Sequence, residues 1–218
     1  MEPENKRLLV NGAREFGIHL NKKAVRAFDL FLKELLRWNQ KINLTAIRTE
    51  EEIIIKHFLD SLSVYPYLPK SASILDIGSG AGFPGIPLKL VDPTLKVTLL
   101  DSVRKKVDFQ RHIIRRLGLS GIDAIHGRAE DQEVCQKMEC RFDCVLSRAF
   151  TNLQTLLLSS DPFLKRGGIA LAMKGRLKEE EVHALNKGGK VHYQLKKTIT
   201  FTLPLTSLKR TILLFEKQ

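Results

Sequence analysis

The sequence predicts an α/β protein in which a helical segment precedes a doubly wound, mostly parallel sheet. From residue 71 onward, short apolar runs alternate with amphipathic stretches of helix length, a pattern typical of parallel strands joined by right-handed crossovers. The last two apolar segments, 191–202 and 208–217, have no helix between them and should pair antiparallel. We therefore expect a helical cap over residues 1–70 and a sheet domain with a terminal hairpin over residues 71–218.

The N-terminal segment should contain three helices, because its apolar residues recur at helical spacing. The expected helices cover residues 8–16, 22–38 and 50–62. Gly17 can stop the first helix, and Asn21 can cap the second. Thr49 and Glu52 form a capping-box pattern at the start of the third. Trp38 continues the apolar face of the second helix, so we expect it to pack in the core rather than to stack on a ligand.

The sheet domain should contain five parallel strands separated by helices. The expected strands lie near residues 73–77, 96–101, 121–126, 142–146 and 168–173, and the expected helices near 84–91, 103–117, 152–160 and 178–186. Pro84 and Pro87 fit the first turn of the first of these helices, where a proline removes no hydrogen bond.

Composition restricts the class of protein. No run of 18 apolar residues occurs, and residues 1–7 lack the apolar stretch of a signal peptide, so we expect a cytoplasmic protein without a membrane span. The three cysteines, Cys135, Cys140 and Cys144, are spaced unlike a zinc site, and we expect reduced thiols and no metal.

Lysine and arginine outnumber aspartate and glutamate by 36 to 24, which gives a formal charge of +12. Such an excess favours a polyanionic partner, and nucleic acid is the natural candidate. The cations cluster at 104–106, 111–112, 115–116, 196–197 and 209–210. Aromatic residues are few, so the sequence gives little sign of base stacking.

A glycine-dense turn follows the first expected strand, at residues 78–85. Gly80, Gly82 and Gly85 formally match the dinucleotide fingerprint, which leaves an NAD(P)-dependent oxidoreductase as an alternative. Asp76 favours S-adenosylmethionine instead, because a carboxylate at this strand end suits a cationic ligand and not a pyrophosphate. Asp101, at the end of the second strand, is placed to accept hydrogen bonds from ribose hydroxyls. The spacing Asp-x-Gly-x-Gly-x-Gly resembles that of class I methyltransferases.

Further candidate residues follow the next three strands, at the sheet edge where open α/β sheets bind ligands. They are Arg128, Ala129 and Glu130 after the third strand, Arg148 after the fourth, and Lys174 after the fifth. Each alone is typical of a solvated surface, and their common position makes them candidates for a site.

Together these segments resemble the glucose-inhibited division protein B family, also called methyltransferase G. The resemblance rests on residues 38–45, 57–62, 76–87, 99–102, 128–130, 147–149 and 174–175, in family order. It implies S-adenosylmethionine-dependent methylation of N7 of a guanine in small-subunit (16S) ribosomal RNA, with the RNA or the assembled subunit as partner. We expect a monomer.

The resemblance also implies where the cofactor is bound. It assigns cofactor contacts to Gly78, Phe83, Ala129, Glu130 and Arg148. The glycine turn adds the backbone of Gly80 and the carboxylates Asp76 and Asp101.

The substrate-side candidates are Arg128, Arg148, Lys174 and Arg210, because N7 of guanine needs no general base and arginine suits a guanine edge or a phosphate. The family usually carries Arg-His entering the last strand. This chain has Arg210-Thr211, so the role of the histidine has no counterpart at that position.

Two questions stay open from the sequence. Asn43, His57, Asp60 and Ser61 either belong to the guanine site or only cap turns and tie the helical segment to the sheet. The protein could also be a non-catalytic RNA-binding protein with a decayed methyltransferase fold, although its glycine motif is intact.

Overall fold

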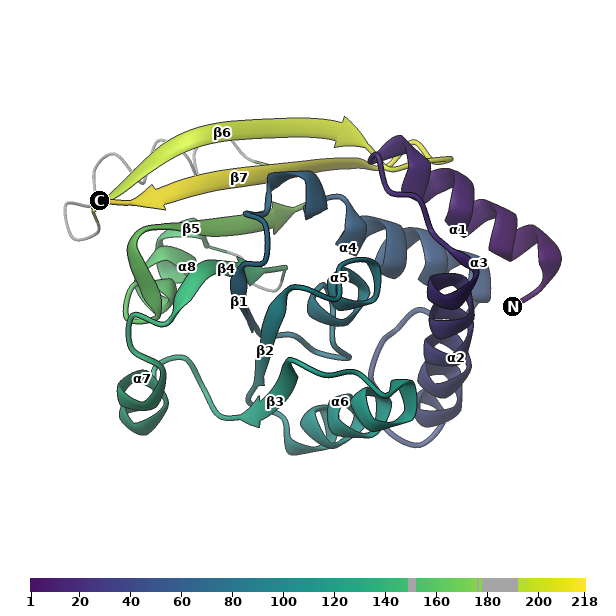
Figure 1. Cartoon of the computed structure of the whole chain (residues 1–218), viewed down its shortest axis with the longest axis horizontal. Coiled ribbons are helices and arrows are strands. Elements are labelled where there is room, and N and C mark those ends of the chain that lie inside the picture. Colours follow the sequence, from purple (N-terminus) through teal and green to yellow (C-terminus); the bar gives the residue numbers. More distant parts are fainter. Residues whose placement is uncertain (149–151, 176, 178–191) are drawn as a thin grey trace.

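The computed structural model describes residues 1–148, 152–175, 177 and 192–218. Its described strands form one seven-stranded sheet with the order β3-β2-β1-β4-β5-β7-β6 (Figure 1). The strands are β1 (Ser73–Ile77), β2 (Lys96–Asp101), β3 (Ile122–His126), β4 (Phe142–Ser147), β5 (Leu164–Lys174), β6 (Tyr193–Thr202) and β7 (Lys209–Lys217). Strands β1 to β5 pair in parallel, and β7 runs antiparallel to both β5 and β6. The predicted α/β class and the terminal antiparallel hairpin are confirmed.

The helices are α1 (Pro3–Glu15), α2 (Lys22–Asn39), α3 (Glu50–Ile53), the π-helix η1 (Ile54–Leu59), α4 (Asp60–Leu62), the 3-10 turn η2 (Tyr65–Tyr67), α5 (Gly85–Val91), α6 (Arg104–Leu117), α7 (Gln132–Met138) and α8 (Leu153–Ser160). The sequence analysis did not predict α7, and it started β5 at residue 168, four residues later than its observed start at Leu164. The helix expected at 178–186 lies outside the described residues.

Local side-chain chemistry sets the starts of the N-terminal helices as the sequence predicts. Asn21 Oδ1 accepts a hydrogen bond from Ala24 N at 2.8 Å, and so caps α2. Thr49 Oγ1 accepts from Glu52 N at 3.3 Å and donates to the Glu52 carboxylate at 3.1 Å. The helix that starts here continues through α3, η1 and α4, and its central turn is π-helical, a feature often found at functional sites.

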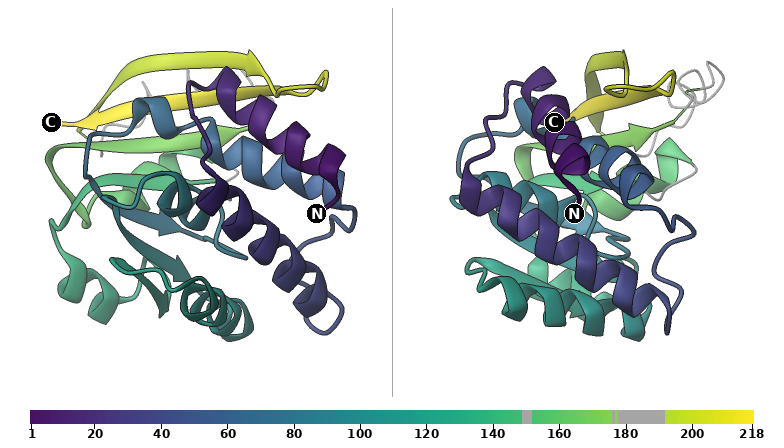
Figure 2. Two further views of the ribbon diagram at one scale, coloured as in Figure 1. Left: turned by 45° about the vertical axis from the view of Figure 1, so that its right-hand side comes forward. Right: turned by 90° about the vertical axis from the view of Figure 1, so that its right-hand side faces the viewer.

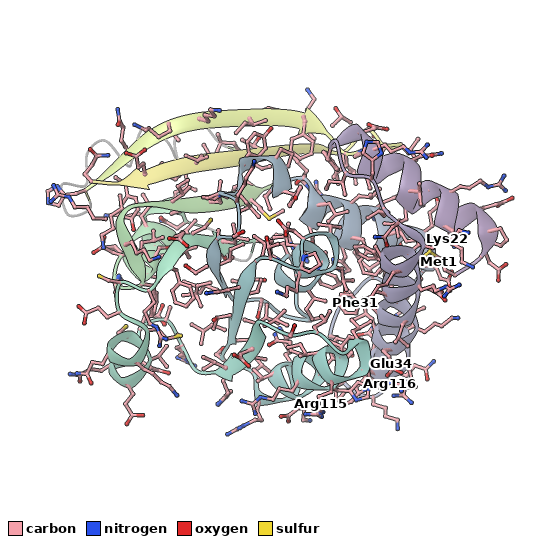
Figure 3. The ribbon with its side chains drawn as sticks, in the orientation of Figure 1. Met1, Lys22, Phe31, Glu34, Arg115 and Arg116 are labelled. Atoms are coloured by element: carbon pink, nitrogen blue, oxygen red, sulfur yellow. The ribbon has the colours of Figure 1, made fainter. Side chains whose placement is uncertain are left out.

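The N-terminal helices share a hydrophobic core with the sheet. Phe31 of α2, labelled in Figure 3, is fully buried. It stacks on Phe83, and its neighbours include Phe58 and Phe109. Trp38 is half-buried and packs against Phe109 at a centroid distance of 5.5 Å, as expected of a core residue. Figure 2 shows α1 and α2 lying against the other helices on this side of the sheet. The division near residue 70 stays a prediction, because this core runs across it.

A second core fills the other face of the sheet, under α7 and α8, where Leu75 and Val145 meet Leu156 and Met138. None of the helices in the described part of the chain is long and apolar enough to cross a membrane. Those same residues contain no group of three His, Cys, Asp or Glu side chains that could hold a metal ion.

Candidate active site

The turn after β1 is rich in glycine because its backbone adopts positive φ at three positions. Gly78, Gly80 and Gly82 have φ values of 70°, 59° and 92°, conformations that other residues rarely adopt. A Cβ atom on Gly85, the first residue of α5, would collide with Leu99 Cδ2. The glycine pattern therefore serves both an open turn and the close packing of α5 on the sheet.

Asp76 is fully buried beneath this turn. Its Oδ2 accepts a hydrogen bond from Gly85 N at 2.8 Å, so the carboxylate holds the start of α5. Its Oδ1 has no hydrogen-bond partner among the described residues. Burial raises the pKa of Asp76 to about 7, against the lowering effects of the Gly85 hydrogen bond and Arg148.

Asp101, at the end of β2, binds the glycine turn from the other side. Its Oδ2 accepts from Gly80 N at 2.8 Å and its Oδ1 accepts from Val103 N at 2.9 Å. Each carboxylate oxygen keeps a further lone pair. Asp101 also lines a pocket of about 300 Å³, which we call the β2–β3 pocket. Its walls are Ile77, Gly78, Leu100, Asp101, Ser102, Gly127, Arg128, Ala129 and Glu130.

The loop after β3 closes this pocket. Arg128 N donates to Asp131 Oδ2 at 2.7 Å, which shapes the loop before α7. Ala129 is buried, whereas Glu130 accepts a hydrogen bond from Ser159 Oγ of α8 at 3.2 Å. Four of the residues expected at the cofactor, Gly78, Asp101, Ala129 and Glu130, thus meet in one pocket.

The other expected cofactor residues lie elsewhere. Gly80 contributes through its backbone to Asp101. The Phe83 side chain is 3% exposed and stacks on the His57 ring at a centroid distance of 4.6 Å, so it belongs to the core. Neither Phe83 nor Asp76 lines the β2–β3 pocket, and Arg148 lines a different one.

The residues of the β2–β3 pocket fit S-adenosylmethionine. Gly78 lets a ligand approach the backbone closely, since its φ is positive and it has no Cβ. The Asp101 carboxylate suits ribose hydroxyls. Asp76 lies beneath the turn and outside this pocket, and one oxygen of its buried carboxyl group has no partner among the described residues.

A second pocket, of about 330 Å³, lies where β5, β7 and η1 meet, and we call it the cationic pocket. It is lined by Ile47, Lys56, Asp60, Arg148, Met173, Lys174, Gly175 and Arg210. Three of the four predicted substrate-side residues, Arg148, Lys174 and Arg210, therefore come together, and the fourth, Arg128, lines the other pocket.

The Arg148 guanidinium is held on several sides by residues of the N-terminal helices. Its Nη1 donates to Lys56 O at 3.1 Å and lies 3.4 Å from Asp60 Oδ2. The guanidinium carbon lies 5.4 Å from the centre of the Phe83 ring. Asp60 Oδ1 also accepts from Arg210 Nε at 2.9 Å, so one buried carboxylate joins both arginines.

His57 completes the support of Arg148. Its Nδ1 lies 3.1 Å from Arg148 Nη2, and a guanidinium can only donate, so Nδ1 is the unprotonated nitrogen. Its Nε2 therefore carries the proton and donates to Thr45 Oγ1 at 2.8 Å. Burial, together with the charge of Arg148, lowers the pKa of His57 to about 3, so the ring is neutral at physiological pH.

The N-terminal motifs thus divide between the two roles considered. His57 and Asp60 touch Arg148, which lines the cationic pocket. Ser61 is fully buried and donates to His57 O at 2.5 Å, which is a structural contact. Asn43 is exposed. Asn39, which the sequence analysis did not single out, accepts from Leu44 N and Thr45 N and so fixes the loop that carries Thr45.

Sequence reasoning also missed Lys56, which lines the cationic pocket next to Asp60. Its only signal is its place one residue before the His57 motif. Thr211, which stands where the family usually has histidine, is buried, and its Oγ1 lies 3.2 Å from Thr200 Oγ1 of β6. Arg210, just before it, reaches Asp60 instead.

Two features define a class I Rossmann-like methyltransferase. The first is the sheet, in which the antiparallel strand β7 lies between β5 and β6, and the second is the glycine turn at the carboxyl end of β1. A solved structure has a similar fold: the SAM-dependent methyltransferase from Aquifex aeolicus gives a TM-score of 0.59 at 13% identity, over 77% of this chain and 93% of that one.

The family follows from sequence comparison. The model of the family described as rRNA small subunit methyltransferase G matches residues 24–209. The Ribosomal RNA small subunit methyltransferase G of Acetivibrio thermocellus is 41% identical over 97% of this chain and 88% of that protein. The protein of the same name from Geotalea uraniireducens is 42% identical over 100% of this chain and 99% of that protein. The chain belongs to this methyltransferase family, and the expected family, fold and enzyme class are confirmed.

Proposed function

We propose that this protein transfers the methyl group of S-adenosylmethionine to N7 of a guanine in 16S ribosomal RNA. Membership of the family supports a methyltransferase that acts on ribosomal RNA. It does not favour the oxidoreductase or the non-catalytic RNA-binding protein.

One observation supports N7 in particular: the described groups around the cationic pocket offer cations and no free general base. His57 is neutral, but both of its ring nitrogens are engaged by Arg148 and Thr45. Asp60 is paired with Arg148 and Arg210. Guanine N7 has a lone pair in the plane of the ring and no proton, so its methylation needs no base.

In this proposal the β2–β3 pocket binds the cofactor, which supplies an electrophilic methyl group on a sulfonium. Asp101 accepts from the ribose hydroxyls, and the loop at Ala129 and Glu130 borders the base. Asp76 remains beneath the turn, where its negative form favours the positive charge of the cofactor.

The residues of the cationic pocket then place the guanine. Arg148, Lys174 and Arg210 donate to O6 of the guanine or to flanking phosphates, and the fork of an arginine matches either acceptor. Because Phe83, His57 and Asp60 hold Arg148, its guanidinium loses little freedom when it binds the substrate. Catalysis comes mainly from alignment of N7, the methyl carbon and the sulfur, which can lower a barrier by several kcal/mol.

Chemical mapping of N7-methylguanine tests this function. Ribosomal RNA from cells with and without the protein is reduced and cleaved at N7-methylated positions. We expect one cleavage in 16S ribosomal RNA that depends on the protein. Purified protein should restore it in RNA from the deficient cells, either as free RNA or as assembled subunits. An identical cleavage pattern in both samples would reject N7 of a 16S guanine as the target.

A further inference from the structure

A groove of about 960 Å³ opens at the end of the sheet opposite to the two pockets of the active site. Its floor includes the first residues of three strands: Lys96 of β2, Ile122 of β3 and Phe142 of β4. Lys96 of the groove and Asp101 of the β2–β3 pocket are the two ends of β2, so these two residues are about 17 Å apart along this strand.

The groove exists because the helices that pack on the sheet do not cover the starts of these strands completely. Strand β3 lies at the edge of the sheet, and Figure 1 shows α6 and α7 on either side of it. Helix α7 has only 7 residues, and the single one that it buries is Met138. Asp123 of β3 therefore stays exposed, and Thr98 of β2 stays half-buried.

The lining of this groove is strongly basic. Its six cations come from β2, α6, α7, the residue before β4, and β5: Lys96, Arg111, Arg115, Lys137, Arg141 and Lys165. Its acids are Asp123 and Asp143. Asp143 is already bound to Lys165 at 2.6 Å and to Ser73 N at 2.8 Å, so it offers little to the other cations.

The remaining cations keep their charge available. Arg111 Nε donates to Ala124 O at 3.1 Å, and Arg141 Nη1 donates to Lys137 O at 3.0 Å. These carbonyl contacts orient both guanidinium groups without neutralising them. In the described structure, no acidic side chain forms an ion pair with Lys96, Arg115 or Lys137.

Two neighbouring arginines of helix α6 differ in whether they have an acidic partner. Arg116 lies 3.7 Å from Glu34 of α2, which also binds Arg37 and His112. Its neighbour Arg115 lines the groove instead (Figure 3). The two residues belong to one basic cluster in the sequence, but only Arg115 is free of an acidic partner in the described structure.

We propose that this groove binds the phosphate backbone of the ribosomal RNA substrate at a distance from the methylated base; the proposal rests on the proposed function. The free cations spread over three elements rather than converging on one point, as suits a chain of phosphates and not a single anion. The only aromatic lining residue, Phe142, is 6% exposed, so bases have no platform on which to stack.

The test compares two triple variants of equal charge loss. In the groove variant, Lys96, Arg115 and Lys137 are replaced by Ala. In the control variant, Lys22, Lys23 and Arg26 are replaced by Ala; all three are exposed at the start of α2 (Lys22 is labelled in Figure 3). The dissociation constant for 16S ribosomal RNA is measured between 50 mM and 400 mM salt by filter binding.

We expect the groove variant to shallow the slope of log K against log[salt] by about two units, because each phosphate contact contributes about 0.7 to 0.9. The control should change it by less than one unit. Affinity for S-adenosylhomocysteine should stay the same in both variants.

An unchanged slope in the groove variant, or an equal change in the control, would overturn the proposal. So would unchanged binding to free RNA with reduced methylation of assembled subunits, since that result would assign the groove to a ribosomal protein. The wild-type protein is assayed for N7-methylguanine in the same preparations. Failure of that assay would count against the proposed function, independently of the slope.

Discussion

Replacing His57 with Asn should make the protein less sensitive to acid, because His57 is the group that the fold keeps neutral. Its pKa is about 3 in the folded protein, against an ordinary value of 6.5. As pH falls below 6.5, the unfolded chain takes up a proton that the folded protein does not. The free energy of unfolding therefore decreases from pH 6.5 toward pH 3.

The size of this effect follows from the two pKa values. Between pH 7.5 and pH 5.5, proton binding to the unfolded imidazole removes about 1.4 kcal/mol of stability. Asp76 acts in the opposite direction, because its raised pKa lets the folded state bind a proton first as pH falls from 7. Its contribution is present in both proteins, so the difference between wild type and His57→Asn isolates the histidine.

Urea unfolding at pH 7.5, 6.5 and 5.5 measures this difference. We expect His57→Asn to be less stable than wild type at pH 7.5, since Asn fills less of the site, and to recover about 1.4 kcal/mol relative to wild type at pH 5.5. His19→Asn, at an exposed histidine outside the site, is the control. A stability difference that does not change with pH would refute the neutral, buried state of His57.

Three further predictions concern other contacts. Asp101→Ala should weaken binding of S-adenosylhomocysteine at least tenfold by isothermal titration, because it removes a carboxylate that binds Gly80 N and lines the β2–β3 pocket. The wild-type protein should not bind NADH in the same experiment. Unchanged affinity of the variant for S-adenosylhomocysteine would show that Asp101 does not belong to the cofactor site. Arg148→Lys should lower the rate of methyl transfer more than tenfold with unchanged cofactor affinity, since lysine cannot reproduce the guanidinium contacts to Lys56 O and His57. Equal rates in the variant and the wild-type protein would show that a positive charge at residue 148 is sufficient for methyl transfer. Gly12→Ala should lower the free energy of unfolding by about 1–3 kcal/mol, because the new Cβ would collide with Leu59 Cδ1. The control Asn11→Ala, on the exposed side of the same helix, should change the free energy of unfolding by less than about 0.5 kcal/mol. Equal effects of the two substitutions would contradict the close contact between Gly12 and Leu59.

Local patterns in the sequence predicted most of the fold. The strands and helices of the sheet follow from apolar periodicity, and the starts of α2 and α3 follow from single capping residues, Asn21 and Thr49. The sequence analysis did not predict helix α7, because this helix buries only Met138 and so has no apolar face to recognise. The early start of β5 was not predicted because Gly167 and Gly168 interrupt the apolar pattern. The pairing of β5 with β4 also shifts register in this part of the strand.

The candidate site was predictable only in part. The carboxyl ends of parallel strands meet at one edge, so Gly78, Asp101 and Ala129 could be placed together from sequence. The support of Arg148 could not, because Asp60 lies 88 residues away from it in sequence and 150 residues from Arg210. The role of Asp76 was also hidden: its Oδ2 is used to hold Gly85 N, a contact that depends on how α5 packs.

The most direct test of methyl transfer without a general base is the pH–rate profile of a single turnover, with the methylated nucleoside identified by mass spectrometry. We predict 7-methylguanosine as the product. The rate constant should show no acidic limb near neutrality, and His57→Asn and Asp60→Asn should change its size but not its shape. Methylation of an exocyclic amine or a ribose hydroxyl, with an acidic limb that disappears on replacing either residue, would contradict this account.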